Sequence, residues 1–237
     1  MKRSEINSIM RDGLAFLAQR RFLLPPFASW TPEAWRAKGP ECRDIVEQQL
    51  GWDITDFGSG DFAGTGLFLF TLRNGTAAGL ADPSGRTYAE KIMIVREGQV
   101  TPTHFHSQKM EDIINRGGGN LVIRLWNATD DDRPADTPVM VCTDGVHRTV
   151  AGGGTITLHP GESVCLAQRN YHRFWGEPGK GTVLVGEVSR VNDDHTDNHF
   201  HDPVGRFPEI DEDEAPLHLL VGDYPAYYRH ARQAGRS

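Results

Sequence analysis

Cysteine is scarce in this chain, which has three among its 237 residues: Cys42, Cys142 and Cys165. The set is odd in number, widely spaced and without C-x-x-C spacing, which argues against a disulfide framework and a thiolate zinc site. We therefore expect three buried, reduced thiols, as in a cytoplasmic protein.

Long apolar runs and an excess of basic charge are also missing. No stretch approaches the roughly 20 apolar residues of a membrane helix, and no apolar segment follows the basic residues near the start, so we expect neither a membrane span nor a signal peptide. The net charge of -7 and the pI of about 5.8 argue against a nucleic-acid partner and allow a small neutral substrate. No motif for a nucleophilic serine, a dinucleotide or a phosphate loop is present.

The length and composition suit one large β-rich domain. Hydrophobic residues make up 38% and charged residues 24%, which allows a packed core. No repeat or linker divides the chain, so we expect a single domain over residues 1–237. We expect a helical arm over about 1–60, a β-barrel over about 61–190, and a C-terminal loop and tail packing on the barrel over about 191–237.

Helix signals are concentrated in the amino-terminal arm. Ser4 is the expected N-cap of a first helix, which Pro25-Pro26 ends. Thr31, followed by proline and glutamate, predicts the start of a second helix. A third helix is expected over about 40–50, closed by Gly51.

Short apolar segments punctuated by Gly, Pro, Asp and Asn follow the arm, and this pattern is typical of a sandwich or barrel, the jelly roll among them. The polar stretch from Asn192 to Pro216 is expected to be a long loop that crosses the barrel mouth. The expected strands cover residues 67–72, 91–95, 121–126, 139–142, 155–158, 163–166, 171–175 and 182–188.

Three histidines and one glutamate form a candidate metal site. His104 and His106 alternate as in a strand, so their side chains share one face. Glu111 can return from the next turn or strand, and His172 lies on a later strand. Such a mixed nitrogen and oxygen set suits Mn, Fe, Co, Ni or Zn.

The spacing of these residues resembles the cupin family. The first cupin motif, G-x5-H-x-H-x(3,4)-E-x6-G, fits residues 98–118 at every position. The second motif, G-x5-P-x-G-x2-H-x3-N, fits only in part, because Ala167, Arg169 and Gly176 replace its proline, glycine and asparagine. The resemblance implies a mainly β fold, the cupin double-stranded β-helix or jelly-roll barrel, with the metal inside.

A closer resemblance, to the D-lyxose isomerase family of cupins, extends over most of the chain. It implies isomerisation of D-lyxose to D-xylulose, and often of D-mannose to D-fructose, with Mn²⁺ as the metal and a homodimer as the assembly. Co²⁺, Zn²⁺, Fe²⁺ and Ni²⁺ remain alternatives for the ion. The resemblance is carried by residues 24–28, 50–57, 88–91, 109–119, 186–189, 192–194 and 205–208.

In aldose–ketose isomerisation a bound cation can stabilise the enediolate while a base moves a proton between C2 and C1, with a direct hydride shift as the alternative. Lys109 and Glu187 are the preferred acid and base, because both lie close to metal-bearing segments. Asp193 and Asp194 are the reserve candidates for the base, with a turn as their alternative role. The candidates for substrate binding are Arg206 and Trp175.

Two other functions are compatible with the ligand set. A cupin dioxygenase also uses three histidines and a glutamate, around iron, and a non-catalytic cupin could simply bind a sugar. The polar residues near the site favour a hydroxyl-rich substrate over an apolar aromatic one. We therefore predict a metal-dependent isomerase of a small neutral sugar.

Overall fold

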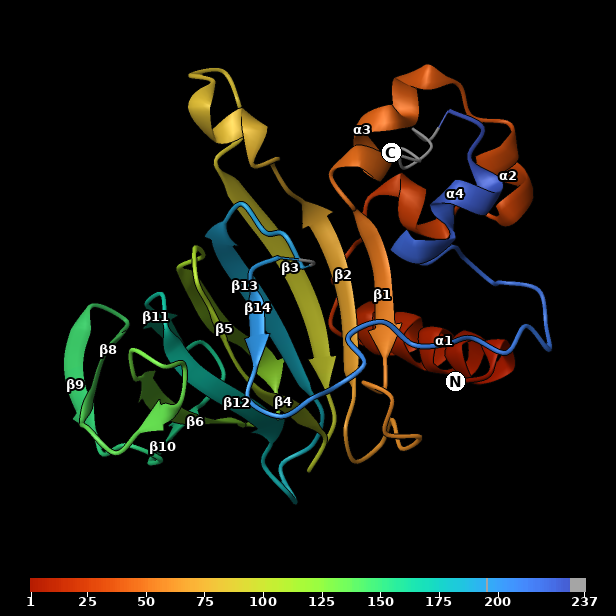
Figure 1. Ribbon diagram of the computed structural model, residues 1–237. Helices are drawn as coiled ribbons and strands as arrows, with labels where there is room; N and C mark the ends of the chain where they lie inside the picture. Colours follow the sequence, from red (N-terminus) through yellow and green to blue (C-terminus); the bar gives the residue numbers. More distant parts are fainter. Residues whose placement is uncertain (195, 231–237) are drawn as a thin grey trace.

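The computed structural model describes residues 1–194 and 196–230, and two curled antiparallel sheets make up its centre (Figure 1). The larger sheet runs in the order β1 (Gly51–Thr55), β2 (Leu67–Arg73), β3 (Tyr88–Val95), β13 (Val183–Arg190), β5 (Glu111–Gly118), β11 (Ser163–Leu166), β8 (Val139–Thr143) and β9 (Val146–Val150). The smaller runs in the order β10 (Thr155–Leu158), β6 (Leu121–Ala128), β12 (Asn170–Gly176), β4 (Val100–His106) and β14 (Asn198–Phe200), with β7 (Pro134–Ala135) beside β6. The mainly β, double-sheet prediction is confirmed.

The larger sheet is buried on both faces along its strands β2 and β3. Leu69 and Met93 point inward to the core between the sheets. Phe70 and Ile92, one position away, point outward into a second core. Successive strand residues face opposite ways, so a continuous apolar run here supplies two cores at once.

Helix α1 (Arg3–Gln19) covers the outer core along β1 and β2 (Figure 1). Ile6, Met10 and Leu17 form its buried stripe. The prediction that Ser4 caps this helix is wrong, because the N-cap is Lys2. Ser4 instead binds the carboxylate of Asp213 through its backbone nitrogen and its hydroxyl, at 2.9 and 2.8 Å.

The other helices of the arm are short: η1 (Pro26–Ser29), α2 (Pro32–Arg36), η2 (Pro40–Cys42) and α3 (Arg43–Glu47). The predicted cap at Thr31 is confirmed, since its hydroxyl accepts a 3.2 Å hydrogen bond from the nitrogen of Ala34. The third helix is shorter than predicted because Gln49 has a left-handed φ of 54°, which no helix continues. Strand β1 then begins at Gly51, so the strands start earlier than the predicted boundary near residue 60.

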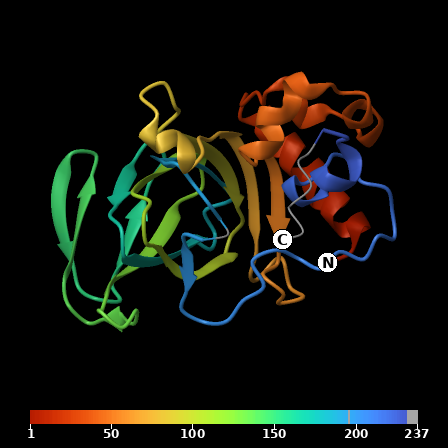
Figure 2. The same ribbon diagram turned by 45° about the horizontal axis from the view of Figure 1, so that its top comes forward.

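The C-terminal segment follows two paths. Its first part crosses the barrel and contributes β14, which pairs with β4. Its second part, with η4 (Val221–Asp223) and α4 (Tyr224–Tyr227), packs on the helical arm around Trp35, as Figure 2 shows for the blue helix beside the red and orange ones. The first part of this C-terminal region therefore lies on the barrel, and its second part packs on the helical arm. Residues 231–237 of the predicted tail lie outside the described residues.

Two of the three thiols are less buried than the sequence predicted. Cys42 is buried, but Cys142 and Cys165 are partly exposed on the outer face of the larger sheet. They occupy directly opposite positions on β8 and β11. Among the described residues, no helix has the length and apolar character needed to cross a membrane.

Candidate active site

A cavity lies inside the barrel, between the two sheets and below the C-terminal loop. Charged and imidazole side chains line it together with apolar side chains, including Phe57, Leu69 and Phe200. The charged and imidazole residues that line it are Lys91, His104, His106, Lys109, Glu111, His172, Glu187, Asp194 and Arg206.

Two neighbouring strands bring the three histidines together. On β4, His104 and His106 share the inward face, and on β12, His172 lies directly opposite His104. All three are buried, and one ring nitrogen of each lies within 4.8 Å of the other two. The three-histidine group predicted from the sequence is thus assembled by strand register alone.

Backbone carbonyls set the tautomers of two of these rings. Nδ1 of His104 donates to the carbonyl of Pro102 at 2.7 Å, and Nδ1 of His172 donates to the carbonyl of Asn170 at 3.0 Å. With hydrogen on Nδ1, the lone pair sits on Nε2, the arrangement of a metal-binding imidazole. Burial, followed by the other two imidazoles, lowers the pKa of His104 well below its usual value, which keeps the ring neutral and able to bind a cation.

Glu111, the first residue of β5, supplies a carboxylate beside the imidazoles. Its Oε1 lies 3.2 Å from Nε2 of His172, and its Oε2 lies 3.5 Å from Nε2 of His106. Burial alone would raise the pKa of Glu111, but Lys109 and then His106 hold it well below the usual range. Oε1 is buried without a hydrogen-bond partner among the described residues, so this donor set fits a divalent cation.

Lys109 links this carboxylate to a second one. Its Nζ lies 2.8 Å from Oε2 of Glu111 and 2.8 Å from Oε1 of Glu187. Asp197 positions it by accepting hydrogen bonds from the backbone nitrogens of Gln108 and Lys109 at 2.6 and 3.1 Å. The ammonium therefore has a fixed place between the two acids.

A chain of alternating charges continues from Glu187 to the far end of the cavity. Lys91 lies 3.6 Å from Glu187 and 3.7 Å from Asp194. Nη2 of Arg206 then contacts Oδ2 of Asp194 at 2.9 Å and Oδ2 of Asp53 at 2.6 Å. Side chains from β1, β3, β13 and two loops thus meet in one buried network.

The electrostatics keep the network ionised. Burial opposes ionisation of Glu187, but Lys109 and Lys91 lower its pKa. Burial likewise opposes ionisation of Asp194, but Lys91 and Arg206 hold its pKa well below the usual range. For Lys109, burial is outweighed by Glu111 and Glu187, which raise its pKa. The cavity therefore presents fixed carboxylates and ammonium groups to whatever enters it.

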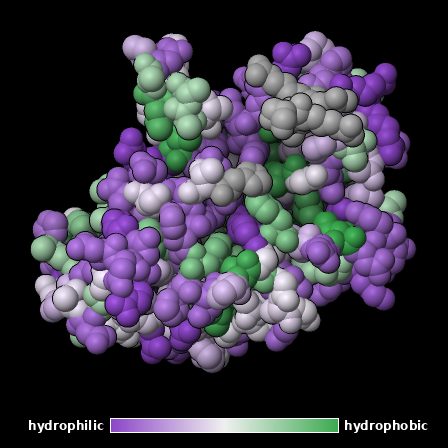
Figure 3. Space-filling view, viewed as in Figure 1, coloured by the Kyte–Doolittle hydropathy of each residue, from purple (hydrophilic) through white to green (hydrophobic). Residues whose placement is uncertain are grey.

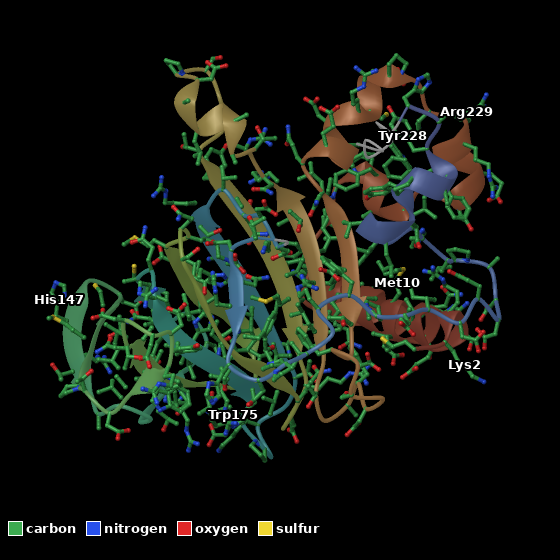
Figure 4. The ribbon with its side chains drawn as sticks, viewed as in Figure 1. Lys2, Met10, His147, Trp175, Tyr228 and Arg229 are labelled. Carbon is green, nitrogen blue, oxygen red and sulfur yellow. The ribbon has the colours of Figure 1, made fainter. Side chains whose placement is uncertain are left out.

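The structure places four of the six predicted catalytic and substrate-binding residues at the cavity: Lys109, Glu187, Asp194 and Arg206. Two predictions need correction. Trp175 is three residues from His172 on β12 and so faces the outside of the barrel, where Figure 4 shows it at the lower rim and Arg173 lies over its ring at 5.4 Å.

Asp193, the second residue whose predicted role is wrong, forms a turn. Its side chain accepts a 2.8 Å hydrogen bond from the hydroxyl of Thr196, and its carbonyl accepts from the nitrogen of Asp197 at 3.0 Å. It thus starts a turn, the alternative role that the sequence left open, and it is not among the residues that line the cavity.

Several residues of the cavity and of the charged network beside it were not predicted as site residues. Lys91 pairs in register with Glu187, and Asp53 reaches Arg206 from a distance of 153 positions in the chain. Both are charged residues inside apolar strands, a signal that could have identified them, because a buried charge needs a partner. Phe200, whose ring centre lies 5.4 Å from that of His104, comes from a strand inside the predicted loop.

Comparisons with known proteins agree on one family. A family model described as D-lyxose isomerase matches residues 1–224. A protein of Escherichia coli O157:H7 named D-lyxose/D-mannose isomerase is 50% identical over 225 residues, which are 94% of this chain and 98% of that protein. One of Serratia proteamaculans with the same name is 51% identical, with the same coverage.

Solved structures resemble the fold at low sequence identity. The L-ribose isomerase of Acinetobacter sp. DL28 in complex with L-ribose has a TM-score of 0.60 and 16% identity, covering 89% of this chain and 98% of that one. The L-ribose isomerase of Geodermatophilus obscurus has a TM-score of 0.57 and 17% identity, with the same coverage. At this level of identity the likeness concerns the fold alone.

Proposed function

The chain belongs to the D-lyxose isomerase family, whose members are sugar isomerases, and from this premise we propose that it interconverts D-lyxose and D-xylulose, and D-mannose and D-fructose. The observation that carries the proposal is the match of the family model over residues 1–224. The curated relatives at 50% and 51% identity carry both sugars in their names. The charged cavity supports it, because polar groups that converge in a pocket suit a polyhydroxylated ligand.

We propose that His104, His106, His172 and Glu111 hold a divalent cation. The Nε2 lone pairs of His104 and His172, whose Nδ1 atoms contact backbone carbonyls, and the unpartnered Oε1 of Glu111 support this assignment. When bound, the cation supplies Lewis-acid stabilisation of the negative charge that develops on the two sugar oxygens. Mn²⁺ is the proposed ion, and Co²⁺, Zn²⁺, Fe²⁺ and Ni²⁺ suit the same donors.

Glu187 is the proposed base that takes the proton from C2 and returns it to C1. Its pKa is lowered by Lys109 and Lys91 despite burial, so the carboxylate is ionised at neutral pH and ready to accept a proton. Lys109, an ammonium between Glu187 and Glu111, is the proposed hydrogen-bond donor to the sugar oxygen at C1 or C2. Glu111 is a poorer base because metal binding would occupy its lone pairs.

Arg206 and Asp194 are proposed to bind hydroxyl groups farther along the sugar. Nη1 of Arg206 is buried without a hydrogen-bond partner among the described residues, and its neighbour Nη2 is held by two carboxylates. The apolar wall with Phe57 and Phe200 offers a surface for the C–H groups of the sugar. Together these groups exclude water from the reacting end of the cavity.

The test is incubation of the Mn²⁺-loaded protein with D-lyxose, D-mannose, D-xylose and D-glucose, scored for ketose by chromatography. We expect ketose from D-lyxose and D-mannose, and slower conversion of their C2 epimers D-xylose and D-glucose, because sites that bond hydroxyls discriminate against a misplaced partner. Oxygen uptake without ketose would instead support a dioxygenase. Sugar binding without turnover in the loaded protein would support a non-catalytic sugar-binding cupin.

We further propose a cytoplasmic homodimer. The support is a pair of exposed apolar residues, Tyr88 at the start of β3, which is 48% exposed, and Leu80 in the segment before it, which is 39% exposed. The nearby projecting η3 turn (Ala78–Ala81) carries exposed Leu80 and has the hydrophobic colour at the upper left of Figure 3. Exposed apolar side chains that gather in this way are typical of protein interfaces. Light scattering on the purified protein tests the mass, and a monomer at micromolar concentration would contradict the dimer.

A further inference from the structure

The β8–β9 hairpin is attached to the larger sheet at its outermost edge. It projects at the left of Figures 1 and 4, with His147 labelled on β9. On its inner face Val139 and Val141 reach the core. Strand β8 pairs with β11 at one position, where Cys142 lies opposite Cys165 and both side chains are on the outer face.

Next to the cysteine pair, a hydrogen-bonded contact joins the turn of the hairpin to β11. Asp144, in the turn between β8 and β9, accepts hydrogen bonds from the nitrogen and the hydroxyl of Ser163 at 3.0 and 2.7 Å. The outer edge of β9 is exposed along most of its length. Core packing of Val139, Val141 and the partly buried Val150, the contact of Asp144 and backbone pairing at the cysteine position therefore all help to hold the hairpin.

The positions of the two cysteines meet the geometric requirement for a disulfide. Directly opposite residues of antiparallel strands have Cα atoms about 4.5–5.5 Å apart and side chains on the same face. A disulfide needs a Cα separation of about 4.4–6.8 Å. Both side chains are partly exposed, so a small oxidant reaches them, whereas Cys42 is buried in the helical arm.

We propose that Cys142 and Cys165 are a redox-active pair, which a small-molecule disulfide such as oxidised glutathione converts to an intramolecular disulfide. The thiolate of Cys142 attacks one sulfur of the oxidant, forms a mixed disulfide and releases one thiolate. The thiolate of Cys165 then attacks the Cys142 sulfur and releases the second. Two protein thiols are oxidised, one small disulfide is reduced to two thiols, and the two protons pass to solvent and the leaving thiolates.

The order of attack follows from the surroundings of Cys165. Burial, and then the carboxylate of Asp112 on the next strand, raise the pKa of Cys165 to about 11, so its thiolate is scarce at neutral pH. Cys142 therefore makes the first attack, and closure of the ring is the slower step. A reducing cytoplasm returns the pair to thiols, so the bond forms under oxidising conditions.

The disulfide stabilises the barrel without entering the cavity. Both sulfurs lie on the outer face, whereas neighbouring Val164 and Leu166 face the core. The ring closed between positions 142 and 165 spans about 24 residues, for which we expect a rise in Tm of roughly 5–10 °C. Isomerase activity should stay within about twofold of the reduced enzyme, because neither cysteine lines the cavity.

The experiment compares the protein before and after equilibration with oxidised glutathione. Thiols are counted with a chromogenic disulfide reagent in denaturant, and three should fall to one. Cleavage after Arg148 places Cys142 and Cys165 in different peptides, so mass spectrometry identifies the link between them. Cys42→Ala is the matched control and should lose two thiols and gain the same Tm increment. Cys142→Ser and Cys165→Ser should form no intramolecular bond and gain none.

Several results would overturn the proposal. They are three remaining thiols after oxidation, stable mixed disulfides on both cysteines, or a disulfide between two copies of the chain. An equal rise in Tm in Cys142→Ser would show that the increment has another origin. Because the thiol count and peptide link do not depend on folding stability or on catalysis, they decide the question even where a variant is destabilised.

Discussion

Replacing Asp53 with asparagine tests how the cavity holds Arg206. The guanidinium contacts Asp53 at 2.6 Å and Asp194 at 2.9 Å through the same nitrogen, and Nη1 has no hydrogen-bond partner among the described residues. Burial would lower the pKa of Arg206, but Asp53 and Asp194 raise it, so the group stays charged. We expect the two carboxylates to fix the orientation of the guanidinium group so that its Nη1 points to a sugar hydroxyl.

The magnitude follows from what remains after the substitution. Asp53→Asn leaves Arg206 paired with Asp194, so the cost in stability should be that of one charged hydrogen bond, about 1.5–3 kcal/mol. It should not reach the about 3–5 kcal/mol of a fully broken buried pair. If half of this cost, about 0.75–1.5 kcal/mol, appears in substrate binding, KM for D-lyxose rises roughly 4- to 13-fold, because 1.4 kcal/mol is a factor of ten. The value of kcat should change little, since the proposed contact is made equally in ground and transition states.

The assay is steady-state kinetics with D-lyxose, together with thermal unfolding of each variant. Asp56→Asn is the matched control, because Asp56 and Asp53 are both 5% exposed and lie three residues apart. Within the part of the chain that the structure describes, the carboxylate of Asp56 accepts hydrogen bonds only from the backbone nitrogens of Gly58 and Gly60. Asp53→Glu should recover part of the KM. An unchanged KM in Asp53→Asn, or an equal rise in Asp56→Asn, would refute the reasoning.

The remaining predictions concern the metal, the base and acid stability. His172→Ala should lose bound Mn²⁺ by elemental analysis, and activity that survives complete chelation would contradict the metal's role. Glu187→Gln should lower kcat by about 10²–10⁴ with unchanged metal content, the usual effect of losing a general base. The lowered pKa of Asp194 gives stability that is present above its unfolded pKa of about 3.9 and lost as pH falls below it. Acid unfolding of Asp194→Asn should therefore show a smaller loss of stability between about pH 4 and 2.

The metal group was predictable from sequence because it depends on local rules. His104 and His106 share a face by strand alternation, and His172 is placed opposite His104 by pairing of β12 with β4. Most strands were also predicted, since apolar runs between turn residues determine them. The prediction that Trp175 lines the pocket is wrong by the same rule, because its odd separation from His172 puts its side chain on the other face of the strand.

The rest of the cavity depends on register between distant strands, which a single sequence does not specify. Asp53 and Lys91 belong to one network only because β1 and β3 flank β2 and the C-terminal loop brings Asp194 and Arg206 back to them. The contacts that hold β1 and β2 beside α1 join residues far apart in the chain, so no local pattern specifies them. Pairing of Cys142 with Cys165 was missed for this reason, although each strand was predicted correctly.

The charges around the cavity give an independent reason to expect a cation there. Carboxylates outnumber the basic groups of the network by one, and the lowered pKa of His104 keeps that imidazole neutral. A buried excess of negative charge is unfavourable unless a positive charge compensates it. The histidine cluster, next to Glu111, is where a divalent cation can bind at the end of the network. The residues in this count are Asp53, Lys91, Lys109, Glu111, Glu187, Asp194 and Arg206.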